Sequence, residues 1–239
     1  MRYRRVLLKL SGEALSNKDG KGILEAQSLD NVAKAIKTMV EEGVEVGVVV
    51  GAGNIWRGKY ADQIGIERST ADYMGMMGTI INALALQSAI ENAGVDCRVM
   101  TSIEVRALAE PYIRRKAIRH LEKGRVVIFG GGTGNPYFST DTTATLRALD
   151  IGAEVVLMAK NGVDGVYSAD PRVDSSAKLL PTLTFQDMLE QDLKVMDLTA
   201  ISLIKDSNLE VRVFNMNDMD NFRKIMNGDP IGTTIRKGK

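Results

Sequence analysis

A glycine-rich segment in the middle of the chain carries the clearest chemical signal. An apolar stretch at 126–129 leads into four glycines, at 130, 131, 132 and 134, and the sequence Ser-Thr-Asp-Thr follows at 139–142. Glycines let a backbone approach a ligand closely, and the start of a helix offers free N–H groups and a favourable dipole to an anion. The segment is therefore typical of a phosphate-binding loop and indicates nucleotide chemistry.

Two further glycine loops follow apolar stretches, and each carries a cation. Lys9 comes near the end of the first stretch, with Ser11 and Gly12 after it, and the sequence VVVGAGNIWRG places Arg57 after two glycines. A lysine at a strand end is more often a solvated charge, and a glycine turn can be purely structural. An arginine beside such a turn can bind phosphate through two hydrogen bonds. Three such loops in one chain favour the functional interpretation over either structural one.

Familiar nucleotide signatures are missing from the sequence. It has no GxxxxGK[ST] loop and no HRD or DFG motif, and GAGNIWRG matches a dinucleotide fingerprint only at its first two glycines. A dinucleotide dehydrogenase is the alternative on this pattern. Separate phosphate loops with Lys9 and Arg57 better suit two phosphorylated ligands that meet head to head. Transfer between them would rest on positioning and charge neutralisation, with Mg²⁺ bridging the donor phosphates.

Two carboxylates could orient a lysine or a metal ion. Asp141 stands at an expected helix start, and Asp197 lies in the sequence KVMDLTA. Each also suits the N-terminal cap of a helix. The sequence leaves the capping and the functional role open for both.

The elements that would position these loops alternate along the chain. Apolar stretches predict strands at 6–10, 44–50, 96–100, 126–129, 155–159 and 211–215. Helical patterns lie at 29–43, 70–93, 111–124, from the glycine loop to about 152, at 184–190, at 197–207 and from 218. We expect Pro111 at a first helical position and a hairpin turn at the Asp-Gly pair of VDGVY. Apolar strands between helices predict a mostly parallel sheet covered on both faces, with ligands at the carboxyl ends of its strands.

Composition limits the class of protein and its partners. The chain has 239 residues, 44% of them hydrophobic, 31 basic and 30 acidic side chains with a net charge of +1, and one cysteine. We expect a single domain over 1–239. The balanced charge does not favour nucleic acid or an anionic membrane as a partner, and a lone cysteine excludes an internal disulfide. No stretch approaches transmembrane length and the N-terminal apolar run is short for a signal peptide, so we expect a cytoplasmic protein.

Six motifs in order along the chain resemble those of the bacterial uridylate kinases, which have the amino acid kinase fold. They are KLSGEAL at 9–15, VGAGNIWRG at 50–58, DYMGM at 72–76, GTGNPYFSTD at 132–141, VDGVYSADP at 163–171 and KVMD at 194–197. GTGNPYFSTD together with DYMGM separates this resemblance from carbamate, acetylglutamate and aspartate kinases. It implies an α/β fold, a three-layer αβα sandwich around a mostly parallel sheet. It also implies transfer of a phosphoryl group from ATP to UMP, with Mg²⁺, in pyrimidine nucleotide biosynthesis.

The resemblance also implies roles for individual residues. With the two carboxylates above, the catalytic set is Lys9, Arg57, Asp141 and Asp197. The ATP-binding positions are Lys9, Leu10, Ser11, Gly12, Gly53, Arg57, Lys160, Asn161, Tyr167 and Asp170. The UMP-binding positions are Ala52, Asp72, Thr133, Gly134, Asn135, Pro136, Tyr137, Phe138, Ser139 and Thr140. Ala52 stands where many relatives have glycine, Asp72 suits the two ribose hydroxyls, and the Asn135 amide can pair with uracil. No residue is assigned directly to a metal.

Regulation and assembly follow from the same resemblance. It implies a GTP effector site at Asn17, Lys18, Asp19, Gly20, Lys21 and Gly22. GTP is a candidate activator, UTP a candidate inhibitor, and a homohexamer the expected assembly. We expect the half at about 1–125 to serve mainly UMP and phosphate, and the half at about 126–239 mainly ATP.

Two alternatives remain at this point. One is another small-molecule kinase of the same fold, acting on a carboxylate or carbamate; the other is a nucleotide-binding sensor or an oxidoreductase. Asp72 and the segment 133–140 suit a nucleoside rather than an amino acid, which favours a uridylate kinase over the first alternative. The second predicts no phosphoryl transfer.

Overall fold

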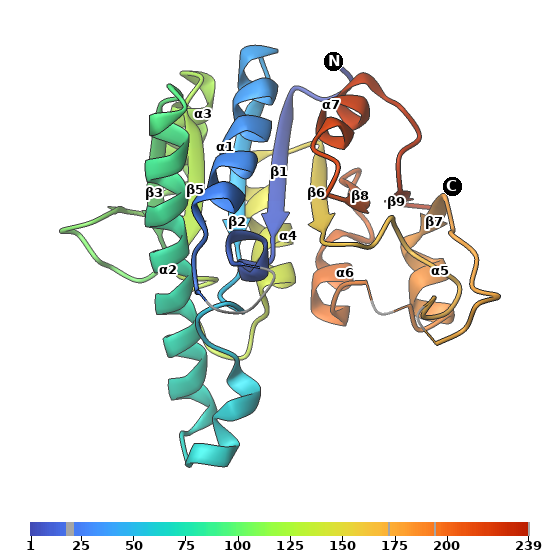
Figure 1. Ribbon diagram of the computed structural model, residues 1–239, viewed down its shortest axis with the longest axis horizontal. Coiled ribbons are helices and arrows are strands. Elements are labelled where there is room, and N and C mark those ends of the chain that lie inside the picture. Colours follow the sequence, from blue (N-terminus) through green and yellow to red (C-terminus); the bar gives the residue numbers. More distant parts are fainter. Residues whose placement is uncertain (18–21, 172, 194, 239) are drawn as a thin grey trace.

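A nine-stranded sheet runs through the part of the chain that the computed structural model describes, residues 1–17, 22–171, 173–193 and 195–238 (Figure 1). Its strand order is β4-β3-β5-β2-β1-β6-β8-β9-β7. The strands are β1 (Arg5–Leu10), β2 (Glu45–Val50), β3 (Cys97–Thr101), β4 (Glu110–Pro111), β5 (Val126–Gly130), β6 (Val155–Lys160), β7 (Thr182–Thr184), β8 (Glu210–Asn215) and β9 (Thr233–Arg236). Neighbours in this described sheet are parallel except for β8 and β9, which are antiparallel. The expected mostly parallel sheet is confirmed.

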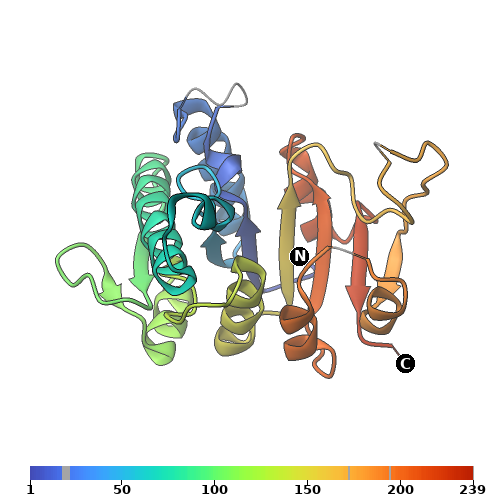
Figure 2. The ribbon, with the colours of Figure 1, turned by 90° about the horizontal axis from the view of Figure 1, so that it is seen from below.

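Helices cover both faces of the sheet (Figure 2). One face carries α1 (Ala26–Glu41), α2 (Arg68–Asn92) and α7 (Asp220–Asn227). The other carries α3 (Arg114–Glu122), α4 (Thr140–Ile151), α5 (Phe185–Glu190) and α6 (Leu198–Ile204). Short 3-10 turns, η1 (Gly12–Leu15), η2 (Gly58–Tyr60) and η3 (Asp62–Ile64), follow β1 and β2. The described chain is therefore the three-layer αβα sandwich that the sequence predicts.

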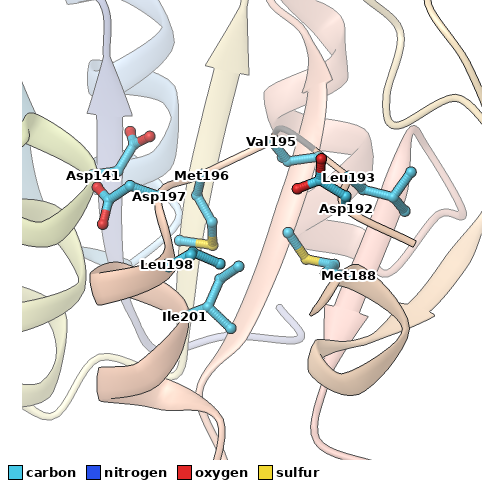
Figure 3. Close-up of a pocket in the computed structure, with 9 residues that line it drawn as sticks. All are labelled: Asp141, Met188, Asp192, Leu193, Val195, Met196, Asp197, Leu198 and Ile201. Atoms are coloured by element: carbon cyan, nitrogen blue, oxygen red, sulfur yellow. The ribbon is translucent and has the colours of Figure 1, made fainter. Parts of the chain in front are cut away.

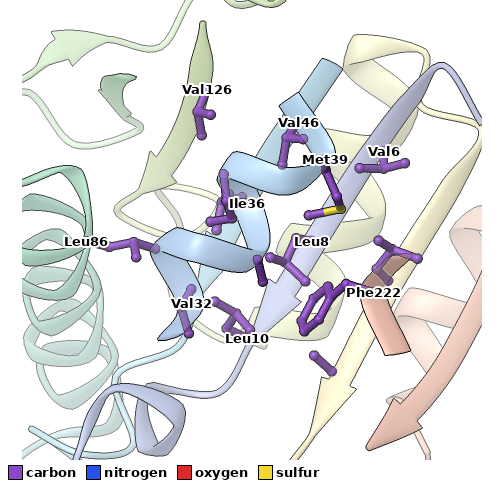
Figure 4. Packing of buried hydrophobic residues seen from close by; sticks show 14 of the residues in the cluster. Val6, Leu8, Leu10, Val32, Ile36, Met39, Val46, Leu86, Val126 and Phe222 are labelled. Carbon is purple, nitrogen blue, oxygen red and sulfur yellow. The ribbon is translucent and has the colours of Figure 1, made fainter. Parts of the chain in front are cut away.

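Each central strand supplies two hydrophobic cores, because successive side chains of a strand point to opposite faces. On β1, Leu8 belongs to the core beneath α1 and α7, with Ile36 of α1 (Figure 4), and Leu7 to the core above α4, with Ala148. Strands buried on both faces read as continuous apolar runs, which is why the sequence identified them. Cys97 of β3 lies in the first core, and burial raises the pKa of its thiol to about 12.

The prediction for Pro111 is wrong. Pro111 is the second residue of β4 and pairs with Thr101 at the edge of the sheet, and α3 begins only at Arg114. The N–H of Tyr112 donates to the carbonyl of Thr101 at 2.9 Å, which continues the pairing by one residue. An edge strand tolerates proline because its missing N–H would face away from the sheet.

The prediction of a hairpin turn in VDGVY is also wrong. A type I′ turn needs positive φ at both central residues, and neither Asp164 nor Gly165 has it. Tyr167 instead forms an antiparallel bridge with Leu179. A Cβ on Gly165 would lie 2.6 Å from Thr233 Oγ1 of β9, so the glycine serves a close approach between segments.

Helix α2 corrects the expectation that no stretch approaches transmembrane length. It has 25 residues and is, by length and composition alone, apolar enough to cross a membrane. Its residues Ala83, Leu86 and Ile90 are buried in the core with β3 and β5, and Asn82 is fully buried among them. We interpret α2 as a core helix of the sandwich.

Strands from both predicted halves of the chain, about 1–125 and 126–239, pair within one sheet. β5 pairs with β2 and β3, so the strand after residue 125 belongs with the first half. The second half of the sheet begins where β6 pairs with β1. Hydrogen-bonded strands lie on either side of both positions, so the division of roles at about residue 125 stays a prediction.

Candidate active site

Lys9 lies at the centre of the carboxyl edge of the sheet. Its register on β1 places it between Val49 of β2 and Met158 of β6. Its ammonium nitrogen is 2.7 Å from Oδ1 of Asp141, and the two side chains are only 12% and 19% exposed. The structure thus brings together two residues of the predicted catalytic set, from β1 and from the first turn of α4.

Asp141 does not cap α4. The cap is Ser139, whose Oγ accepts a hydrogen bond from the N–H of Thr142 at 3.0 Å. Ser139 takes the position that Ser and Asp residues favour at helix starts, which leaves the carboxylate of Asp141 available for Lys9.

Asp197 combines the two roles that the sequence left open. It caps α6, since Oδ1 accepts from the N–H of Ala200 at 2.9 Å, and it also accepts from the hydroxyl groups of Ser139 and Thr142. Burial pushes the pKa of Asp197 upward, but the hydrogen bonds from Ser139 and Ala200 outweigh burial and leave the pKa below its ordinary value. Asp197 is therefore an anion that joins the starts of α4 and α6.

Lys160 brings a second ammonium group to the same place. It ends β6, and its Nζ lies 3.5 Å from the carbonyl oxygen of Val195. Burial lowers the pKa of Lys160, the nearby charge of Lys9 lowers it further, and Asp141 opposes both. Two cations and one carboxylate thus meet at the end of β1 and β6, an arrangement that favours a bound anion.

A cavity of about 310 Å³, called the α2 cavity below, opens between α2, the loops after β2 and β5, and the start of α4. Six residues predicted to bind UMP line it: Ala52, Asp72, Thr133, Phe138, Ser139 and Thr140. Gly53 and Arg57, predicted on the ATP side, line it as well. Two of the three glycine loops, those after β2 and β5, therefore line one cavity, with Gly53 and Arg57 on the side of Asp72. Lys9 of the remaining loop contacts Asp141, at the start of α4.

Four other residues predicted for UMP do not line the α2 cavity: Gly134, Asn135, Pro136 and Tyr137. They form the outer part of the loop, where the N–H of Tyr137 donates to Oδ2 of Asp72 at 2.8 Å. Tyr137 has a φ of 72°, which is uncommon for a residue with a side chain. Asp72 also accepts from Arg68 at 3.0 Å, so its carboxylate holds the loop to α2 and keeps capacity for further donors.

The loops after β1 and β2 are joined to each other. Arg57 forms an ion pair with Glu13 and donates from Nε to the carbonyl of Gly53 at 3.1 Å. A Cβ on Gly12 would lie 2.7 Å from the carbonyl oxygen of Gly51, so the two loops can meet only through a glycine. Of the neighbouring predicted residues, Ser11 precedes η1, and Leu10 has its side chain in the core, so only its backbone can reach a ligand.

A second cavity, the β6 cavity, has a volume of about 640 Å³ and lies on the other side of Lys160. Its lining includes three of the ten residues predicted for ATP, namely Lys160, Tyr167 and Asp170. The other seven, including Asn161 and Lys9 to Gly12, do not line it. Most of the wall is the segment 162–171, and the rest is Val213 with 191–193 and Val195.

A third cavity, the α6 cavity, of about 570 Å³, connects these sites (Figure 3). It shares Asp192, Leu193 and Val195 with the β6 cavity, and Asp141 and Asp197 lie at its other end. The wall between them is apolar and comes from Met188 of α5, Met196 of the connection that follows, and Leu198 and Ile201 of α6. A ligand in the β6 cavity thus has a continuous surface toward the Lys9–Asp141 pair.

Comparison with known proteins assigns this chain to a protein family. Residues 4–215 match the Amino acid kinase family. A uridylate kinase from Pediococcus pentosaceus is 55% identical over 99% of this chain and 98% of its own length. This chain belongs to the uridylate kinases of the amino acid kinase family.

Solved structures agree with this membership. The crystal structure of UMP kinase from Bacillus anthracis has a TM-score of 0.97 and 42% identity, covering 100% of this chain and 98% of that one. That of UMP kinase from Ureaplasma parvum has a TM-score of 0.93 and 36% identity, covering 99% and 100%. The resemblance inferred from the six motifs is confirmed at the level of the family.

Several lining residues of this uridylate kinase site were not found from the sequence. In the α2 cavity they are Trp56, Gly58, Ala71, Gly75, Met76, Thr79, Gly132 and Thr143. A usable signal existed for some of them, because positions 72, 75, 76 and 79 share one face of a helix. In the β6 cavity the stretch 191–193 was missed, and no motif marks it.

The predicted GTP residues of the family site fall mostly on a part that is not described. Lys18, Asp19, Gly20 and Lys21 lie outside the described residues. Of the two others, Asn17 is half-buried and Gly22 is exposed. The carbonyl of Ile23, the residue after Gly22, accepts from the amide of Asn54 at 2.5 Å, which joins Ile23 to the loop after β2.

Proposed function

We propose that this chain transfers the γ-phosphoryl group of ATP to UMP, giving UDP and ADP, in pyrimidine nucleotide biosynthesis. The observation that carries the proposal is the position of the Lys9–Asp141 pair, 2.7 Å apart. Thr140, next to Asp141, lines the α2 cavity, and Asp141 itself lines the α6 cavity that leads to the β6 cavity. Two separate cavities with cations between them suit two phosphorylated ligands, and family membership supports UMP as the acceptor.

UMP would occupy the α2 cavity. The carboxylate of Asp72 suits the ribose hydroxyl groups, and Thr133, Phe138, Ser139 and Thr140 of the loop would surround the uracil. Asn135, in the outer part of the loop, would pair with the uracil edges once that part closes over the ligand. The backbone of Ala52 and the guanidinium of Arg57 would hold the phosphate, and Arg57 would then exchange its partner Glu13 for the ligand.

ATP would occupy the β6 cavity, with its adenosine against Tyr167 and Asp170. Lys160, Asn161 and the backbone at 10–12 would contact its phosphates from the carboxyl edge of β6 and β1. In this proposal the first five strands of the sheet, β4 to β1, form the UMP side, and β6 to β7 form the ATP side.

Catalysis would rest on position and charge. An acceptor phosphate oxygen is already ionised at neutral pH, so no general base is required. The ammonium groups of Lys9 and Lys160 would offset the charge on the transferred group, and Asp141 would orient Lys9. Asp197 would hold Ser139 and thereby the start of α4, whose N–H groups face the same site.

The residues present fit a Mg²⁺ ion held mainly by the nucleotide. Among the described residues no group of three or more His, Cys, Asp or Glu side chains could hold an ion by itself. Oδ1 of Asp141 is buried, and its described partner is the ammonium of Lys9, 2.7 Å away. Mg²⁺ is typically bound by one or two carboxylates together with substrate phosphates, so Asp141 is the candidate ligand. When bound, the ion would withdraw charge from the donor phosphates.

Regulation, assembly and location complete the proposal. GTP would activate through the segment 17–22 and UTP would inhibit at the nucleotide sites. A cytoplasmic homohexamer is the proposed assembly, and the exposed apolar side chains of Tyr73, Met77 and Ile81 on α2 support self-association.

The direct test supplies ATP, Mg²⁺ and GTP with one acceptor at a time, namely UMP, CMP, AMP, dTMP, carbamate or N-acetylglutamate, and measures ADP. Activity confined to UMP supports the proposal. ADP formation confined to carbamate or N-acetylglutamate would contradict UMP as the acceptor. No ADP formation with any of the acceptors would contradict kinase function.

A further inference from the structure

One face of α2 is hydrogen-bonded to both loops that frame the α2 cavity. Asn82 is fully buried; its Nδ2 donates to the carbonyl of Gly51 at 2.7 Å, and its amide pairs with that of Asn54 at 2.8 and 3.0 Å. The hydroxyl of Thr79 accepts from the N–H of Gly131 at 2.9 Å. Residues three apart lie on the same face of a helix, so α2 fixes the loop after β2 and the loop after β5 together.

Gly78 lies on this face, opposite Ala52. A Cβ on Gly78 would be 2.9 Å from the Cβ of Ala52 and 3.6 Å from the Cβ of Ile55. Carbon atoms ordinarily pack at about 3.5 to 4.0 Å, so a second methyl cannot be accommodated without movement. One methyl fills the space between the helix and the loop, and Ala52 already supplies it.

Neither partner can move away freely. The hydrogen bonds of Thr79 and Asn82 set the distance between α2 and both loops. The carbonyl of Ala52 also accepts from the N–H groups of Ile55 and Trp56, at 2.9 and 2.8 Å, and so begins the turn that leads to Arg57. A displaced Ala52 would shift that turn.

Backbone conformation does not account for a glycine at this position. Gly78 lies inside α2 and is not among the residues with positive φ. Glycine weakens a helix interior relative to alanine, so space rather than conformation favours it here.

We propose that Gly78 is a positioning residue for the acceptor. By leaving room for the methyl of Ala52, it keeps the backbone of Ala52 at the wall of the α2 cavity, where the UMP phosphate would bind. The two positions form a compensating pair, in which a methyl fits on the loop or on the helix but not on both. This inference rests on the proposed function.

The test is a double-mutant cycle of Gly78→Ala, Ala52→Gly and the double variant, with KM for UMP, KM for ATP and kcat measured for each. Gly78→Ala is expected to raise the KM for UMP about tenfold, with the KM for ATP nearly constant, because a small displacement of a phosphate-binding loop weakens positioning. Ala52→Gly should raise the KM for UMP about twofold, because glycine gives the loop more conformational freedom. The double variant should return to within about twofold of the parent, since the pair is coupled.

The outcomes separate this inference from the function. A parent that does not phosphorylate UMP overturns the proposed function. A parent active on UMP whose Gly78→Ala variant keeps the parental KM for UMP, or whose double variant shows no recovery, overturns the pair alone. If Gly78→Ala does not fold, the double variant decides: a parental KM for UMP supports the pair, and an elevated one overturns it.

Discussion

The α2 cavity and the β6 cavity differ in how their walls are held. The smaller α2 cavity, about 310 Å³, has walls hydrogen-bonded to one helix through Asp72, Thr79 and Asn82. The larger β6 cavity, about 640 Å³, is walled mostly by coil at 162–171 and 191–193. Its described anchors include Thr233, whose Oγ1 accepts from the N–H of Val166 at 2.8 Å and donates to the carbonyl of Leu180 at 2.6 Å, and Asn215, whose Oδ1 accepts from the N–H of Gly162 at 3.3 Å.

This difference indicates where specificity lies. A site of fixed, buried polar groups rejects a wrong ligand strongly, because groups that find no partner are costly to bury. A site walled by coil adapts to its ligand and discriminates less. We expect the acceptor to be chosen narrowly and the donor to be held more by its phosphates.

Removal of the charge between the cavities should have the largest effect. Lys9→Met is expected to lower kcat about 1,000-fold and change the KM for UMP only a few-fold, because the ammonium stabilises charge on the transferred group. Steady-state kinetics measure both. The matched control is Lys34→Met, an exposed lysine of α1 paired with Asp30. A Lys9→Met enzyme with more than about a tenth of parental kcat would contradict this role for Lys9.

The substitution Asp72→Asn tests the α2 cavity, whose walls are held by hydrogen bonds to α2. Asp72→Asn keeps the shape and removes the charge and one acceptor oxygen, so we expect the KM for UMP to rise about 10- to 100-fold while the KM for ATP stays near parental. Asp30→Asn, at an exposed site on α1, is the control for loss of a surface carboxylate. Equal changes in both KM values would remove the assignment of Asp72 to the acceptor.

The substitution Thr233→Val tests the β6 cavity, whose wall is mostly coil. Thr233→Val removes the hydroxyl that anchors Val166 and Leu180, so the β6 cavity should loosen. We expect the KM for ATP to rise about fivefold and the KM for UMP to stay constant, from the loss of hydrogen bonds to buried backbone. If the KM for UMP rises as much as that for ATP, the two cavities are not independent.

The substitution Asp197→Asn tests the α6 cavity, which connects the other two cavities, and we expect it to have the smallest effect of the four substitutions. Its pKa lies below the ordinary 3.8, so its charge stabilises the fold above that pH, and the stabilisation is lost as pH falls through the folded pKa. Asp197→Asn keeps a good cap, so we expect a loss of about 1 kcal/mol of unfolding free energy at pH 7. Urea unfolding at pH 7 and at pH 3, which lies below the ordinary pKa of 3.8, measures it. The difference between the two proteins should narrow at the lower pH, and a difference that widens would contradict the charged role.

The sequence predicted those elements whose signal is local. The strand at 6–10 and its neighbours are continuous apolar runs, and such runs identify strands that are buried on both faces. The short strands β7 and β9 were not predicted, because three or four residues with partly exposed side chains carry no periodic signal. Pro111 was read from its preference for helix starts, whereas its place is set by pairing with Thr101, which lies ten positions earlier.

The candidate site divides in the same way. Lys9, Arg57, Asp72 and the loop at 132–141 were found because motifs mark them. Asn82 and Thr79 were not, since a polar residue in a long helix gives no hint of a partner 31 or 52 positions away along the chain. The separate roles of Asp141 and Asp197 also depended on contacts between α4, α6 and β1. Long-range pairing is the information that local patterns lack.

The buried thiol of Cys97 can report on local opening of this protein. The sequence contains one cysteine, it lies in the core on β3, and burial raises its pKa to about 12. A thiol reagent near pH 8 therefore reacts only with molecules in which β3 has separated from α2, and the labelling rate follows the population of that open form. Because α2 also anchors both loops of the α2 cavity, UMP should slow labelling in proportion to its occupancy, while a ligand of the β6 cavity should do so less.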